Sequence, residues 1–120
     1  MTEIQADLPA YTFELYQDHA MRTAKEIGDV EDILHAALGM TSEAGEMASS
    51  VKAWLAYGKE LDVKNIVEEM GDIMWFIALM CRRLGVSMEQ VAVHNIAKLY
   101  ERYPEKYSDE DAITRADKAE

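Results

Sequence analysis

The sequence contains only one cysteine, two prolines and six glycines in 120 residues, and it has no long apolar run. A lone cysteine, Cys81, excludes an intramolecular disulfide, and its apolar surroundings indicate core packing. No apolar run reaches the roughly 18 residues that a membrane span needs. The acidic N-terminus also lacks the basic-then-apolar pattern of a secretion signal. We therefore expect a cytoplasmic protein with no membrane partner.

Basic residues are scarce as well. Twelve Lys and Arg stand against 23 Asp and Glu, which gives a net charge of −11. Nucleic-acid binding needs a concentrated basic surface, so no nucleic-acid partner is expected. An anionic ligand would require cations between it and the protein. The three histidines, His19, His35 and His94, lack the spacing of a zinc site, and no glycine-rich phosphate loop or nucleophile set occurs.

Helix-forming residues dominate what is present. Nearly half of the residues are apolar, and they show no strand-like alternation, which favours an all-α fold. The length suits one domain with a single core, and we expect four to five helices. The predicted organisation is a loose leader over residues 1–10, an all-α domain over residues 11–104 and a charged tail over residues 105–120.

Capping and stop signals define the expected helices. These cover residues 13–27, a stretch from about 29–32 to 57, a stretch from about 62 to 85, and residues 88–102. The signals are N-caps at Thr12 and Asp62, a bend at Gly39, and stops at Gly28, Gly85 and Pro104.

The helix that begins near residue 62 carries the most informative segment. Three acids within residues 68–72 precede nine consecutive apolar residues, 73–81. Because the second part is apolar all round, we expect it to be buried on every side. Its apolar stripe is predicted to pack against that of the preceding helix; the two stripes are Ile66, Met70, Ile73, Ile77, Met80 and Leu84, and Met40, Ala44, Met47, Val51 and Leu55.

Two pairs of acids flank these stripes. Glu43 and Glu46 form an i, i+3 pair on one helix, and Glu69 and Asp72 repeat the spacing on the next. If the stripes pack together, all four carboxylates converge, and oxygen ligands on facing helices suit Mg²⁺, with Mn²⁺ as an alternative. The simpler interpretation is a solvated helix surface. Glu68 is either a solvated acid or a general base that points further from the stripe.

Other side chains are candidates for substrate contact. Asn95, Lys98 and Arg102 align on one helix side, where they either grip phosphate oxygens or form a solvated basic face. Trp54 and Phe76 either stack on a base or belong to the core. Phe76 is the better stacking candidate because it shares the helix face of Asp72.

Three segments together resemble the MazG-type nucleotide pyrophosphohydrolases, an all-α group that includes dCTP pyrophosphatases and dimeric dUTPases. The segments are 38–46, 68–75 and 95–104. The mark of this family is an E-x-x-E pair followed by an E-x-x-D pair on the next helix. Here the pairs are Glu43/Glu46 and Glu69/Asp72, with 22 residues between Glu46 and Glu69. The resemblance covers roughly residues 11–104.

The resemblance implies that the four acids bind Mg²⁺ and that the enzyme converts a nucleoside triphosphate and water to the monophosphate and pyrophosphate. It also implies that Lys98 and Arg102 contact phosphates and that the chain forms a homodimer or homotetramer. We expect a deoxynucleoside triphosphate more than a larger substrate, with dNTP pool control or the removal of damaged nucleotides as the purpose. Two other classes stay open: a nucleotide or metal sensor without turnover, and a helical oligomerisation module.

Overall fold

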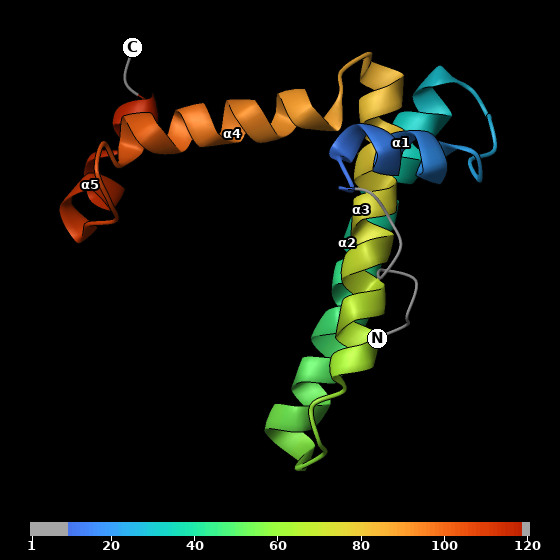
Figure 1. The fold of residues 1–120 in the computed structure, drawn as a ribbon. Helices are drawn as coiled ribbons and strands as arrows, with labels where there is room; N and C mark the ends of the chain where they lie inside the picture. Colours follow the sequence, from blue (N-terminus) through green and yellow to red (C-terminus); the bar gives the residue numbers. More distant parts are fainter. Residues whose placement is uncertain (1–9, 119–120) are drawn as a thin grey trace. The chain divides into compact units, whose positions relative to one another are not determined.

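The computed structural model describes residues 10–118, and all regular secondary structure in this range is helical (Figure 1). The predicted all-α class is confirmed for this part of the chain, whereas residues 1–9 of the predicted leader lie outside it. The chain divides into two compact units, Met1–Met88 and Glu89–Glu120. The helices are α1 (Phe13–Met21), α2 (Asp29–Tyr57), α3 (Val63–Leu84), α4 (Met88–Arg102), α5 (Asp109–Thr114) and a 3₁₀ turn (Ala116–Lys118).

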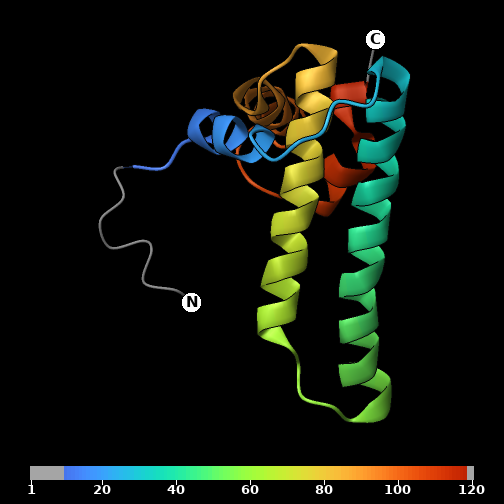
Figure 2. The ribbon, with the colours of Figure 1, turned by 90° about the vertical axis from the view of Figure 1, so that its right-hand side faces the viewer.

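An antiparallel hairpin of α2 and α3 forms the body of the first unit (Figure 2). Gly58 ends α2 in the left-handed conformation, with φ of 67°. Asp62 then caps α3, because its side chain accepts a hydrogen bond of 3.0 Å from the Asn65 backbone amide. Gly85 ends α3, again left-handed with φ of 71°. Both predicted ends of this helix are therefore confirmed.

The bend predicted at Gly39 is wrong, since α2 runs without a break from Asp29 to Tyr57. A glycine is needed at this position because the ring of Phe76 lies directly against it. A methyl group built on Gly39 would overlap the ring of Phe76, so only glycine allows α3 to approach α2 this closely. Gly39 is a contact residue of the hairpin.

The residues that α2 buries completely are small or polar. They are Asp32, Ala36 and Gly39, and Ala78, Leu79 and Cys81 are the buried residues of α3. The predicted packing of the two apolar stripes is only partly right, because both stripes include exposed residues, such as Met70 in α3 and Val51 in α2. Leu55 is 77% exposed and Leu84 is 59% exposed.

Helix α1 packs on α3 and is shorter than predicted (Figure 2). Thr12 caps it as expected, accepting a hydrogen bond from Leu15 N at 3.1 Å. The helix ends at Met21 instead of residue 27, because other donors occupy the Ala20 carbonyl. Thr23 N (3.1 Å), Thr23 Oγ1 (2.6 Å) and Trp75 Nε1 (3.1 Å) all donate to it. A tertiary contact therefore replaces the next turn.

The second unit contains most of α4 and the residues that follow it. Helix α4 ends at Arg102, two residues before Pro104, as predicted. Ser108 caps α5 by accepting a hydrogen bond of 3.1 Å from Asp111 N. Arg102 Nε and Nη2 donate to the two Asp117 carboxylate oxygens at 2.7 and 2.9 Å. The predicted tail thus contains two short helical segments, and Asp117 ties it to the end of α4.

Candidate metal centre

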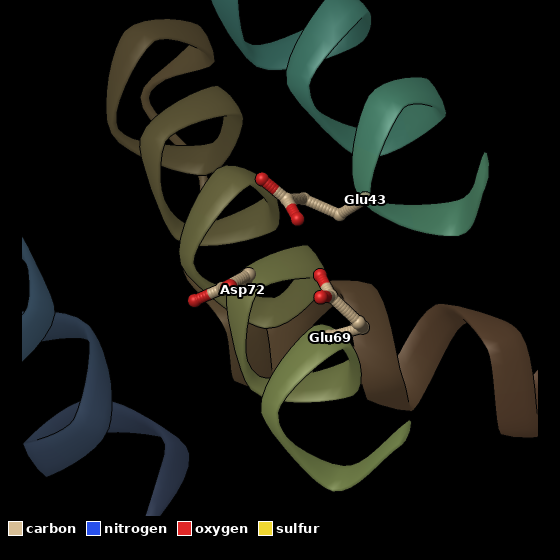
Figure 3. Close-up of side chains that lie close together, drawn as sticks. All are labelled: Glu43, Glu69 and Asp72. Carbon is tan, nitrogen blue, oxygen red and sulfur yellow. The ribbon is translucent and has the colours of Figure 1, made fainter. Parts of the chain in front are cut away.

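Three carboxylates from two helices meet in the seam between α2 and α3. Each of Glu43, Glu69 and Asp72 offers a ligand oxygen, and these oxygens lie within 4.8 Å of one another (Figure 3). Glu43 comes from α2, whereas Glu69 and Asp72 come from α3. Three carboxylate oxygens without a nitrogen or sulfur donor are a ligand set for a hard cation such as Mg²⁺ or Mn²⁺.

Helix geometry explains how Glu43 enters this seam. It follows Asp32, Ala36 and Gly39 at intervals of four, three and four residues, so it lies on the same face of α2 as these buried positions. Glu69 and Asp72 are three residues apart on α3 and share a face in the same way. The small side chains at Ala36 and Gly39 allow the two helices to approach each other.

Glu69 is the electrostatically unusual member of the cluster. Its Oε2 atom is buried and has no hydrogen-bond partner among the described residues. The adjacent Glu43 carboxyl group, burial and the charges of Glu43, Asp72 and Glu46 together raise the pKa of Glu69 from 4.5 to about 7. A buried oxygen that lacks a donor beside further carboxylates is a position that a cation would satisfy, so the residues fit a divalent metal.

The fourth predicted ligand, Glu46, does not belong to the group of three. It is exposed on α2, one turn after Glu43, although its charge still acts on Glu69. Glu68 is exposed on α3 and lies outside the group as well. The structure thus brings together three of the four acids that the sequence indicated.

The predicted phosphate contacts belong to the second unit. Asn95 is exposed on α4, and Lys98 is half-buried there. Arg102 is already engaged, because its Nε and Nη2 atoms both donate to Asp117. This pairing raises the pKa of Arg102 and lowers the pKa of Asp117 to about 2.

The two aromatic candidates differ in their surroundings. The ring of Phe76 lies in the seam against Gly39 and makes edge contacts with His35 and Trp75, with centroid distances of 5.3 and 5.1 Å. Trp54 lies near the end of α2 and is 48% exposed. Their predicted role in base stacking stays a prediction.

Two polar features were not predicted from the sequence. Tyr16 on α1 donates its hydroxyl hydrogen to the Gly71 carbonyl at 3.4 Å, one residue before Asp72. Asp32 is fully buried and accepts from Arg83 Nη2 at 2.5 Å, and Arg83 Nη1 also donates to Asp29 at 2.8 Å. In the sequence, Tyr16 is part of an apolar helix face and Asp32 is one acid among many. Neither carries a local signal for its partner.

Comparison with known proteins adds a family match to this geometry. The family model described as the MazG nucleotide pyrophosphohydrolase domain matches residues 31–107. The chain is also similar to the Gene 37 protein of Mycobacterium phage L5. The two are 30% identical over 98 residues, which cover 74% of this chain and 86% of the phage protein. No solved structure matches the chain significantly.

Proposed function

Because the family match spans more than half of its residues, the chain belongs to the MazG nucleotide pyrophosphohydrolase family, and we propose that it is a metal-dependent hydrolase of nucleoside triphosphates. The proposed reaction converts a ribo- or deoxyribonucleoside triphosphate and water to the monophosphate and pyrophosphate. We place it in the cytoplasm, in control of the dNTP pool or in nucleotide house-cleaning. The observation that carries the proposal is the meeting of the Glu43, Glu69 and Asp72 oxygens within 4.8 Å.

In this proposal Glu43, Glu69 and Asp72 hold Mg²⁺, with Mn²⁺ as a substitute, and Glu46 contributes negative charge from the next turn. The metal, when bound, would neutralise the triphosphate, activate a water for attack at the α-phosphorus and stabilise the departing pyrophosphate. The buried Oε2 of Glu69 supports this assignment because no donor among the described residues satisfies it.

The protein's own residues supply the remaining functions. With a pKa of about 7, Glu69 can exchange a proton near neutral pH when no cation is bound. Lys98, Asn95 and Arg102 are proposed phosphate contacts on the basis of the family resemblance. The acidic charge of the chain repels a free triphosphate, so substrate should bind well only together with its cation.

The test is pyrophosphate release from a panel of common NTPs and dNTPs, with Mg²⁺ and with EDTA. We expect release only with the metal, and monophosphate as the co-product. Asp72→Ala should lower kcat by at least about 100-fold, as loss of an electrostatic contact to the transition state typically does. Glu60→Gln, an exposed acid in the α2–α3 loop, is the matched control for lost charge. Full activity in Asp72→Ala would refute the assignment.

The same experiment separates the enzyme from the two other classes. Nucleotide binding without pyrophosphate release would favour a sensor. No binding of nucleotide or metal would favour an oligomerisation module, which the exposed apolar side chains of α2 also fit. Pyrophosphate release that depends on the metal would show that the protein is neither only a sensor nor only an oligomerisation module.

We further propose that the working form is a homodimer or homotetramer. Large apolar side chains cover the outer face of α2, including Val30, Leu34 and Leu38 at 63%, 55% and 68% exposure. Their spacing of four residues places them on one side of the helix. Contiguous apolar surface of this kind is typical of a protein interface.

A further inference from the structure

A small aromatic pocket lies between α1 and α3 on the first unit. It has a volume of about 190 Å³ and is lined by Tyr11, Thr12, Phe13, Tyr16 and Met74. Most of its lining is apolar ring and thioether surface. This volume is below the roughly 300–1,000 Å³ of a pocket for a drug-sized ligand, but a single planar ring system needs less room.

Tyr16 links this pocket to the carboxylates. Its ring lines the pocket, and its hydroxyl group donates to the carbonyl oxygen of Gly71, the residue before Asp72. Burial raises the pKa of Tyr16, and the charges of Tyr11 and Asp72 raise it further. In Figure 3 the carboxylate of Asp72 is directed toward the side of α3 on which α1 lies. The pocket and the carboxylates are therefore neighbouring sites around α3.

The polar groups of the pocket are already engaged within the protein. The Tyr11 hydroxyl is 2.7 Å from His19 Nδ1. Thr12 Oγ1 accepts from the Leu15 amide at 3.1 Å, and the Tyr16 hydroxyl donates to Gly71. The pocket consequently offers a ligand aromatic faces and little hydrogen bonding. Such a surface suits stacking on a flat ring, and stacking tolerates any base because every base has a π-face.

We propose that this aromatic pocket binds the nucleobase of the triphosphate whose phosphates lie at Glu43, Glu69 and Asp72. The inference rests on the proposed function and adds to it a base subsite on α1, with Phe13 and Tyr16 as the stacking residues. Phe13 is 43% exposed, so its ring is open to a ligand. The subsite distinguishes nucleotides from other triphosphates, but it discriminates weakly among the bases.

The experiment compares two ligands in the presence of Mg²⁺. One is a non-hydrolysable α,β-imido nucleoside triphosphate, in a purine and a pyrimidine form. The other is ribose 5-triphosphate, which has no base. Calorimetry on the wild-type protein should show that both nucleotides bind roughly 5- to 150-fold more tightly than ribose 5-triphosphate. This is the gain in affinity that one base stack supplies.

Substitutions at Phe13 then test whether the nucleobase stacks on this ring. Phe13→Ala should remove most of this preference and leave the affinity for ribose triphosphate unchanged. Phe13→Leu keeps apolar bulk without a π-face and should show the same selective loss if the fold is intact. Tyr57→Ala, which removes an exposed aromatic ring at the end of α2, is the control and should behave as wild type. Unchanged preference in both Phe13 variants, or equal loss for both ligands, would overturn the proposal.

Failure of the base subsite and failure of the reaction give different results. A wild-type protein that releases pyrophosphate, with Phe13 variants indistinguishable from Tyr57→Ala, would refute the subsite and leave the reaction standing. A wild-type protein that prefers nucleotides through Phe13 but releases no pyrophosphate would support the subsite and refute the proposed reaction.

Discussion

At the scale of single residues, Glu69 is the most perturbed carboxylate of the proposed metal site. One of its oxygens is buried without a donor, and the Glu43 carboxyl group beside it raises its pKa to about 7. Near neutral pH a proton and the proposed cation would therefore compete for the same group, since ligand carboxylates must be deprotonated. Cation binding at the proposed site should therefore depend on pH near neutrality.

We predict that Mg²⁺ affinity increases as pH rises through about 7 and weakens by roughly tenfold per pH unit below it. Calorimetric titration between about pH 5.5 and pH 8 would measure this change. Glu69→Gln should bind the metal more weakly and lose the dependence, whereas Glu60→Gln should retain it. Equal affinity of the wild-type protein across the range would contradict the prediction.

The same pKa predicts the sign of a stability effect in the metal-free protein. The folded-state pKa of Glu69 is raised above 4.5, so the native state binds more protons than the unfolded state between about pH 4.5 and pH 7. The contribution of Glu69 to stability therefore falls as pH rises through this window. Thermal unfolding at about pH 8 without metal should show Glu69→Gln to be more stable than wild type. Added Mg²⁺ should reverse the order.

At the scale of helices, the α2–α3 seam depends on one glycine. Gly39→Ala would drive a methyl group into the Phe76 ring, and overpacking of this kind costs roughly 1–3 kcal/mol. Gly45 lies on the same helix with open space around its Cα, so Gly45→Ala should instead stabilise by roughly 0.5–1 kcal/mol. Chemical denaturation followed by circular dichroism would compare the two variants. A Gly39→Ala protein as stable as Gly45→Ala would refute this account of the seam.

The end of α4 is the second place where elements depend on one contact. Arg102→Ala should release the residues that follow α4 and speed hydrogen exchange in Asp109–Thr114, because Asp117 loses both donors of its pair. Lys98→Ala is the matched control for lost charge on α4. It should leave this exchange unchanged, and, as a proposed phosphate contact, it should raise KM for the triphosphate. Unaltered exchange in Arg102→Ala would show that the pair does not hold the segment.

Local signals account for what the sequence could predict about these helices. The caps at Thr12 and Asp62, the stop at Gly85 and the bounds of α4 each depend on residues within one turn, and they were predicted correctly. The end of α1 depends on Trp75, which is more than fifty residues away, and it was missed. The separation of Glu46 from the other acids depends likewise on how two helices are rotated against each other, which i, i+3 spacing does not define.

For the molecule as a whole, the main surprise is where its large apolar side chains lie. The sequence predicted that residues 73–81 are buried on every side, yet in one chain only Ala78, Leu79 and Cys81 are buried. An amphipathic helix normally turns an apolar stripe toward its neighbour, whereas the buried residues of α2 are the small or polar Asp32, Ala36 and Gly39. The apolar surface of the hairpin is left for other contacts.

We therefore predict an assembly of two or four 13.6 kDa chains in sedimentation equilibrium. Leu38→Glu would place a charge in the proposed interface and should shift the mass toward that of one chain. Glu60→Gln, in the exposed loop, should leave it unchanged. A wild-type protein that sediments as a monomer at all concentrations would refute the assembly.

The hairpin also has a consequence for how the protein is made. Its two helices follow each other in the chain and are joined by a five-residue connection over 58–62. Contacts between segments that are close in sequence form fastest, and domains begin to fold during synthesis. All three carboxylates belong to this hairpin, so they are in place once α3 has left the ribosome. The nascent chain should therefore be able to bind the proposed cation before the residues that follow α3 have folded.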